Sequence, residues 1–192
     1  MSRALCFLAC VVGLSLPVLG CNNDKPHEKG CDDQALVVDT AVMAYLSKAR
    51  ALHHEANLKE DAGDLDGAVV ALHRLTESAQ PHEGTRIPEV EEVLADAHAR
   101  IAELALRQSR FDAAKTEVDK GLTHAEGATY FRGHLLEVGG LIETARSKSL
   151  ADAGKTKEAE EARQRALKLL GEAISVQDRV IGLALGDAGA KP

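Results

Sequence analysis

Histidines and carboxylates are the side chains of this chain that could do chemistry, and His53, His54 and Glu55 form the closest group of them. Adjacent residues of a helix point about 100° apart, so these two histidines cannot bind one ion. A zinc-hydrolase helix needs two histidines four residues apart, and this segment has no such pair. Other histidines stand singly, at His73, His98, His124 and His134. The sequence predicts no metal site and no cofactor.

Carboxylates and nucleophiles are the next candidates for catalysis. Glu91-Glu92 and Glu160-Glu161 are neighbours along expected exposed helix faces, so nothing holds either pair across a cleft as acid–base work requires. The chain has no G-x-S-x-G or S-x-x-K pattern, and no cysteine follows Cys31. We therefore predict that the protein is not an enzyme and has no catalytic residue.

Cys21 is the residue whose surroundings point to a definite chemistry. It follows PVLG at residues 17–20 and precedes the polar stretch NNDKPHEKG. The segment before it carries one charge, Arg3, followed by an apolar run of roughly 16 residues, which is shorter than the ~20 needed to span a bilayer. Pro17 and Gly20 break the helix near its end. These features predict a signal peptide over residues 1–20.

Val18, Leu19, Gly20 and Cys21 resemble the lipobox of bacterial lipoproteins, although Val18 stands where that family most often has leucine. The resemblance implies that Cys21 is lipidated and becomes the N-terminal residue after cleavage. Two or more acyl chains would hold a protein stably at a bilayer. Asn22 and Asn23 follow the cysteine, and the family's sorting logic then implies an outer-membrane protein facing the periplasm. The alternatives are an ordinary secretory peptide with a chance cysteine and an uncleaved anchor.

Cys31 is the one cysteine left over by this scheme, because Cys6 and Cys10 belong to the signal peptide and Cys21 carries lipid. It is expected to be an unpaired surface thiol or to form an intermolecular disulfide. Residues 21–31 are polar, contain Pro26 and Gly30, and lack hydrophobic periodicity. They are expected to form a flexible tether between membrane and domain.

Composition indicates the fold class of the remainder. Aromatic residues make up 3% of the chain and tryptophan is absent, so the core must be built from alanine, leucine and valine. Such side chains suit close helix packing, and we predict an all-α protein. The formal net charge of -7 at pH 7 disfavours nucleic acids and anionic bilayers as partners.

Hydrophobic periodicity predicts about six helices in a domain over residues 32–186, followed by a frayed tail over 187–192. The first is expected between N-caps at Asp32 or Asp33 and the breaker Gly63. The second ends at Gln80, the third opens at Pro88, and the fourth follows the SRFD turn at 109–112. The fifth covers about 128–153, with a bend or close contact at 139–140, and the sixth begins near 155.

Three turns between these helices have the same character. They are GDLDGA at 63–68, SRFDAA at 109–114 and GKTKEA at 154–159, spaced by about 46 and 45 residues. Recurrence at a near-constant interval predicts an array of helical hairpins.

The turns resemble those of tetratricopeptide repeats, whose hairpins turn on a Gly-Asp-Tyr-x-x-Ala-like sequence. The small residues of that motif match Ala56, Ala102 and Ser147 in the first helices, and Ala68, Ala114 and Ala159 in the second helices. Leu72 and Val118 match the larger apolar position. The interval here exceeds the family's 34 residues, and most of its aromatic residues are replaced. An irregular antiparallel bundle with similar turns is the alternative.

The resemblance also implies a partner groove lined by the first helix of each hairpin. The positions that would face it are Arg50, His53, Asn57, Glu60, Asp96, Glu103, Arg107 and Lys148. They are mixed in sign, and their alternative interpretation is an ordinary solvated surface.

Together these features predict a lipid-anchored envelope protein that binds another envelope protein or peptide as an interaction or assembly module. The competing interpretation is a structural or ligand-binding helical bundle, dimerised through Cys31.

Overall fold

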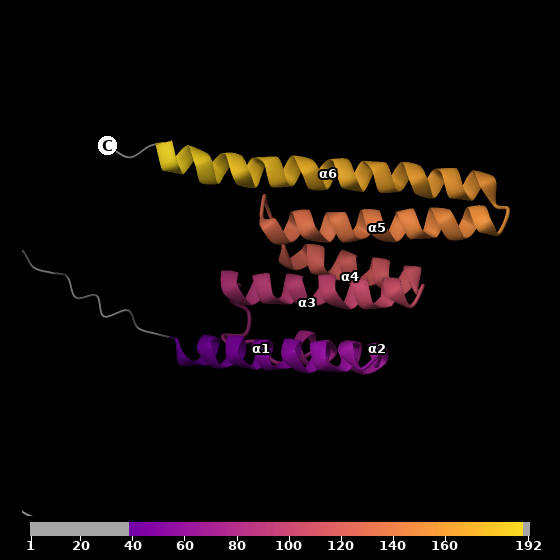
Figure 1. The fold of residues 1–192 in the computed structure, drawn as a ribbon. Coiled ribbons are helices and arrows are strands. Elements are labelled where there is room, and N and C mark those ends of the chain that lie inside the picture. The colour runs from indigo at the N-terminus through magenta and orange to yellow at the C-terminus, as the bar shows by residue number, and fades with distance from the viewer. Residues whose placement is uncertain (1–38, 190–192) are drawn as a thin grey trace, which may run out of the picture. The chain divides into compact units, whose positions relative to one another are not determined.

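The computed structural model describes residues 39–189, which lie in the second of two units into which the chain divides, residues 1–37 and 38–192. The described residues form six α-helices and no strand, which confirms the predicted all-α array of antiparallel hairpins (Figure 1). The helices are α1 (Thr40–Asp61), α2 (Leu65–Thr76), α3 (Pro88–Arg107), α4 (Phe111–His124), α5 (Tyr130–Asp152) and α6 (Thr156–Gly189).

The three predicted turns share one backbone geometry. Gly63, Ser109 and Gly154 all have positive φ, at 81°, 59° and 75°. In each turn the amide of the next residue bonds back to a carbonyl five residues earlier, at 2.8–2.9 Å. This is a Schellman ending, which satisfies the last carbonyls of the first helix and reverses the chain. The sequence repeat is therefore also a repeat of local structure.

The small residues on which the repeat was recognised lie where paired helices approach most closely. Ala56 and Ala68 pack together with Leu72 between α1 and α2. Ala102 and Ala114 pack with Val118 between α3 and α4, and α5 adds Val138 and Ile142 to the same cluster. Between α5 and α6 the Ser147 hydroxyl donates to the Ala159 carbonyl at 2.7 Å. Small side chains at these positions permit the close pairing that a larger residue would prevent.

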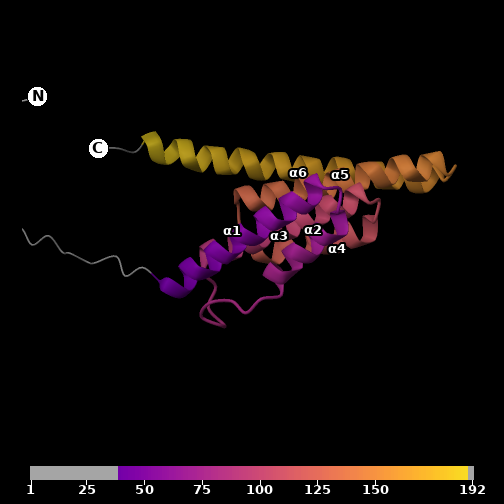
Figure 2. The same cartoon turned by 60° about the horizontal axis from the view of Figure 1, so that its bottom comes forward.

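The hairpins stack so that α1, α3 and α5 lie side by side in one layer, with α2 and α4 forming a second layer behind α1 and α3 (Figures 1 and 2). Leu75, Val90 and Leu94 are fully buried where α3 covers the first hairpin. The third hairpin differs, because α6 packs against α5 and against no other described helix.

Some helix boundaries differ from those expected. The side chain of Asp39 caps α1, at 3.0 Å from the Ala41 amide, whereas Asp32 and Asp33 lie outside the described residues. The second helix ends at Thr76 instead of Gln80, because the Ser78 amide and hydroxyl bond back to the Leu75 carbonyl. The last helix continues to Gly189, three residues into the expected tail.

Gly139 and Gly140 are a close-contact point within a continuous α5. A Cβ on Gly140 would lie 2.7 Å from the Leu170 side chain on α6. The glycines therefore serve the packing of α5 on α6.

Candidate interaction surface

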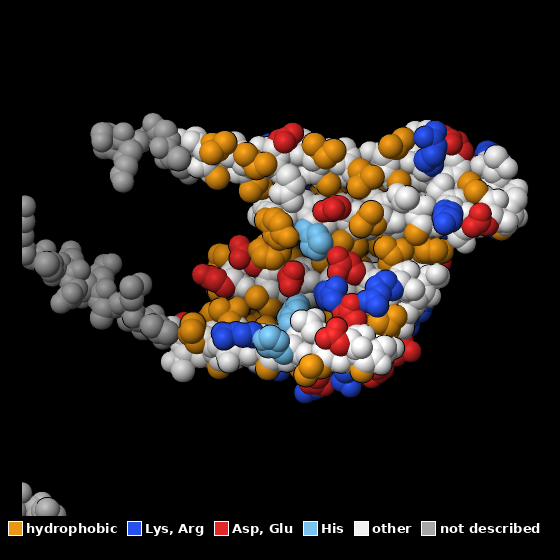
Figure 3. Space-filling model, in the orientation of Figure 1, with side chains coloured by type: hydrophobic (Ala, Val, Ile, Leu, Met, Phe, Trp, Pro, Cys, Tyr) orange, Lys and Arg blue, Asp and Glu red, His pale blue; other side chains and the backbone are white. Residues whose placement is uncertain are grey.

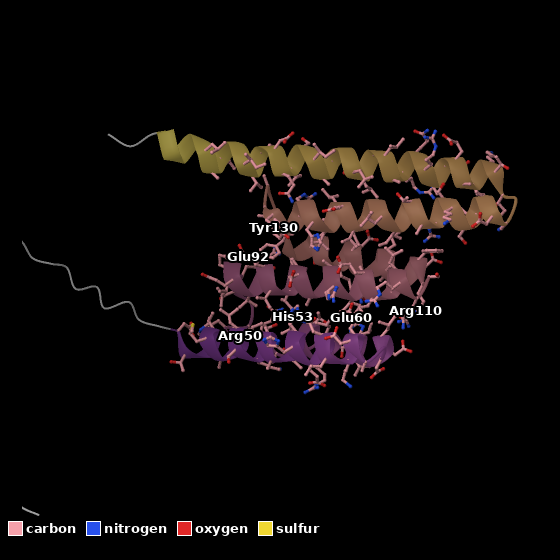
Figure 4. The ribbon with its side chains drawn as sticks, viewed as in Figure 1. Arg50, His53, Glu60, Glu92, Arg110 and Tyr130 are labelled. Carbon is pink, nitrogen blue, oxygen red and sulfur yellow. The ribbon has the colours of Figure 1, made fainter. Side chains whose placement is uncertain are left out.

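The first helices of the three hairpins, α1, α3 and α5, lie in one layer, and the resemblance implied a partner groove along these helices. Arg50, His53 and Glu60 follow one another along α1, with Glu92 on α3 and Tyr130 on α5 in the same view (Figure 4). Charged and histidine side chains gather between α1 and α3, whereas apolar side chains follow α6 (Figure 3). We call the exposed side of α1, α3 and α5 the A face.

His53 and Asp96 are brought together across α1 and α3, with 3.8 Å between Nε2 and Oδ2. Burial of the imidazole lowers the pKa of His53 below its ordinary value of 6.5, and the nearby Arg100 acts in the same direction, while Asp96 opposes them. A histidine with a lowered pKa is neutral at pH 7. His53 therefore presents an uncharged donor and acceptor on the A face.

Glu60 joins α1 to α3 through two arginines. Its carboxylate accepts hydrogen bonds from both Arg100 and Arg107, and Arg100 also donates to Glu103 at 3.0 Å. Glu103 in turn lies 3.8 Å from His134 on α5. A connected set of charges thus crosses all three helices, and its positive and negative groups neutralise one another.

Three of the predicted groove positions stand apart from this network. Arg50, Asn57 and Lys148 are exposed and form no ion pair or side-chain hydrogen bond with the other described residues. The structure therefore brings together five of the eight predicted residues, His53, Glu60, Asp96, Glu103 and Arg107, and leaves three open to solvent.

Sequence reasoning missed Arg100 and His134, the two residues that complete the network. Arg100 stands four residues after Asp96 and seven before Arg107, so its helical spacing already placed it on the same face. His134 had no such signal, because its contact with Glu103 depends on how α5 lies against α3.

A second polar cluster lies inside the array, between α3 and α4. His98 Nδ1 is 2.8 Å from Glu117 Oε2, and both side chains are buried. The His98 ring stacks on that of His124 at 5.6 Å, and His124 Nδ1 is 3.0 Å from Glu91. Arg86 closes the chain of contacts by donating to Glu91 at 2.8 Å.

Hydrogen bonding decides the charge state of these carboxylates. Burial alone would raise the pKa of Glu117, but hydrogen bonds from His98 and Lys120 outweigh it and hold the pKa at about 2. Burial likewise opposes the bonds that Arg86 and His124 make to Glu91, and the net pKa of Glu91 is lowered. Both carboxylates are ionised and fully paired, which is the arrangement of a structural network between helices.

Neither cluster assembles a metal site: the described residues contain no group of three or more histidine, cysteine, aspartate or glutamate side chains placed to hold an ion. Over the same residues, no helix combines the length and apolar character needed to cross a membrane. Cys21 and Cys31 lie outside the described residues.

No protein-family model, curated protein or solved structure matches this chain. The resemblances to lipoboxes and to tetratricopeptide turns therefore remain predictions drawn from residues alone, while the hairpin array itself rests on the helices described above.

Proposed function

We propose that this protein is a lipid-anchored protein of the bacterial cell envelope that binds another protein or peptide through the A face. The observation that carries the proposal is the layer of α1, α3 and α5, whose charged side chains are joined by ion pairs between the helices. A prearranged surface of this kind loses little conformational freedom when a partner binds, which favours affinity. The tetratricopeptide-like turns support the same function by resemblance.

Exposed residues beside the charge network are suited to contact a partner. Arg50, Asn57 and Lys148 have no competing partner within the described part of the chain and sit on α1 and α5, two of the helices that carry the network. A protein or peptide with carboxylates at matching positions would pair with Arg50 and Lys148. Nucleic acid is disfavoured by the net charge of -7 and by the pairing of the arginines in the network.

The anchor is supported by the sequence Val18–Cys21 and by the polar residues that follow it. In the proposal Cys21 carries the lipid, the outer membrane holds it, and the described domain faces the periplasm. Replacing the thiol removes the lipobox sulfur to which the diacylglycerol would be attached by a thioether.

Cys21→Ser tests the anchor. We expect the variant to lose incorporation of labelled fatty acid and to move from the membrane fraction to the soluble fraction or to remain as unprocessed precursor. Cys31→Ser is the matched control and should fractionate as the wild type. Unchanged processing and membrane binding of the Cys21 variant would contradict lipidation.

Partner binding is tested by affinity capture from detergent-solubilised envelopes with the full chain. Charge reversal at Arg50 together with Lys148 should remove a protein that the wild type enriches, because both side chains are exposed and form no ion pair with another described residue. Lys157→Glu, on the exposed start of α6, is the control and should retain it. Equal capture by all three proteins would exclude the A face as the binding site.

A further inference from the structure

The groove of the third hairpin is uncovered, unlike those of the first two. The first hairpin is covered by α3, which contacts both α1 and α2, and the second by α5, which contacts both α3 and α4. Within the described part of the chain nothing takes the corresponding place over α5 and α6. The array therefore ends on a surface of the type that elsewhere in this fold receives a helix.

Exposed apolar side chains gather on this hairpin. Leu141 of α5 and Leu167, Ile174 and Ile181 of α6 are 46%, 54%, 63% and 55% exposed. The three α6 residues recur every seven positions, so they lie on one side of the helix. Figure 3 shows apolar side chains at intervals along α6. Several large exposed apolar residues in one stripe mark a contact surface.

Between the two helices runs a groove of about 440 Å³ with Leu170, Ala173 and Ile174 in its lining. Gly171 follows Leu170 on α6, and no described atom comes within 4 Å of the position that its Cβ would occupy. A mid-helix glycine costs about 1 kcal/mol relative to alanine. The described chain offers no packing reason for that cost, whereas a helix docking closely from outside would supply one.

The charges at the groove select the partner. Glu137 and Asp178 line it, and Asp178 has no ion-pair partner among the described residues. A second copy of this chain, docking groove to groove about a two-fold axis, would bring both carboxylates of each copy into one apolar contact, which is strongly unfavourable. A helix carrying lysine or arginine would instead pair with them.

We propose that the groove between α5 and α6 binds an amphipathic helix of another protein. The helix would present apolar residues at three- and four-residue spacing to Leu167, Leu170 and Ile174, with basic residues beside Glu137 and Asp178. It would contact both α5 and α6, as α3 contacts both α1 and α2. This assignment rests on the proposed interaction function and names the chemical class of the partner for the end of the array.

Site-specific photo-crosslinking in cells tests the proposal on the full-length chain. A photoreactive residue at Ile174 should form an adduct with a second protein, while the same residue at Val70, which is 60% exposed on α2, should not. Mass spectrometry of the adduct should identify a segment with apolar residues at helical spacing and a net positive charge. Leu167→Asp should lower the adduct yield about tenfold or more, because a carboxylate would be buried in the contact.

The rim charges provide a second variant that leaves the apolar surface intact. Glu137→Gln with Asp178→Asn should lower the adduct yield several-fold while circular dichroism stays unchanged, since both side chains are on the groove rim. An unchanged yield would show that the basic character assigned to the partner is wrong.

Four other results would overturn the proposal: an adduct of twice the chain's mass, an adduct with lipid, no adduct, or an adduct segment that is neither amphipathic nor basic. A photoreactive residue at Asn57 on the A face separates this inference from the function on which it rests. Crosslinking at Asn57 without crosslinking at Ile174 would leave the A face as a binding surface and reject the groove. If neither Asn57 nor Ile174 gave an adduct, both the A face and the groove would be rejected as binding surfaces.

Discussion

The hydrogen bond between Glu117 and His98 links α4 to α3 out of reach of water. Its 2.8 Å length and the additional bond from Lys120 at 2.7 Å keep the carboxylate ionised inside the array. Removing one partner of a buried charged hydrogen bond costs more than the bond contributes, because the other partner is left unsatisfied. The pair should therefore be visible in both the stability and its dependence on pH.

Glu117→Gln should lower the free energy of unfolding at pH 7 by about 2 kcal/mol. The pKa of Glu117 is about 2 in the folded protein, below its ordinary 4.5. The ionised carboxylate therefore stabilises the fold fully above pH 4.5, and this stabilisation is lost as the pH falls towards 2. The difference in the free energy of unfolding between the variant and the wild type should shrink across that interval. Urea unfolding at several pH values measures it. As a control, Asp119→Asn removes an exposed ion pair on the same helix and should not lower the free energy of unfolding. If the difference between Glu117→Gln and the wild type stayed constant at all pH values, the lowered pKa assigned to Glu117 would be contradicted.

Ser109 has the geometry of a glycine without being one. Its φ of 59° matches those of Gly63 and Gly154 in the equivalent turns. Ser109→Gly should raise the free energy of unfolding by about 1 kcal/mol, because glycine adopts this conformation without steric conflict. Gly63→Ser should lower it by a similar amount, and no atom lies near enough to add a clash. Thermal unfolding of both variants measures these changes in stability. If both substitutions stabilised the protein, or both destabilised it, the two turns would not be equivalent.

At the scale of elements, α6 is unusual in packing against a single helix over its 34 residues. The small residues Ala162, Ala166 and Ala173 are buried against α5, whereas Gly171 and the apolar stripe lie on exposed parts of the helix surface. The two sides of the helix should respond oppositely to the same kind of substitution.

Gly171→Ala should raise the free energy of unfolding by about 1 kcal/mol through helix propensity, since its Cβ would enter open space. Gly140→Ala on α5 should lower it, because its Cβ would lie 2.7 Å from Leu170 and overpacking costs about 1–3 kcal/mol. Chemical denaturation of the two variants tests this. Stabilisation by both would mean that α5 and α6 are not in close contact at Gly140.

At the scale of the whole described domain, the two outer hairpins communicate only through the middle one. Neither α1 nor α2 contacts α5 or α6. Arrays of this kind have stability that is approximately a sum of terms for each repeat and its neighbours. Local loss of stability should therefore stay near its origin.

Leu72→Ala removes a fully buried side chain from the first hairpin and should cost about 2–5 kcal/mol. Native-state hydrogen exchange should show faster exchange in α1 and α2, with α5 and α6 close to wild type. Leu58→Ala, at an exposed position on α1, serves as the control and should change neither the free energy of unfolding nor the exchange rates. Equal acceleration in all six helices would indicate one cooperative unit.

Local physics explains how much of the fold was predictable. Left-handed residues at 63, 109 and 154 and alanines early in the next helix are short-range signals, and they located the hairpins correctly. Pro88 marked the start of α3 for the same reason. The predicted end of α2 at Gln80 was wrong because the Ser78 hydroxyl donates to the Leu75 carbonyl and the helix ends earlier. The hydrophobic pattern carries no information about that bond.

The sequence by itself determined the all-α class, the positions of the turns and which polar residues share one side of each first helix, because these depend on residues within a few positions of one another. Only the tertiary structure decided which of those residues meet. Glu60 and Arg100 are 40 residues apart, and His134 reaches Glu103 from another hairpin. The uncovered α5–α6 groove is likewise a property of the assembled array. Such contacts depend on the packing of helices against one another, which is set by the shapes of many side chains at once.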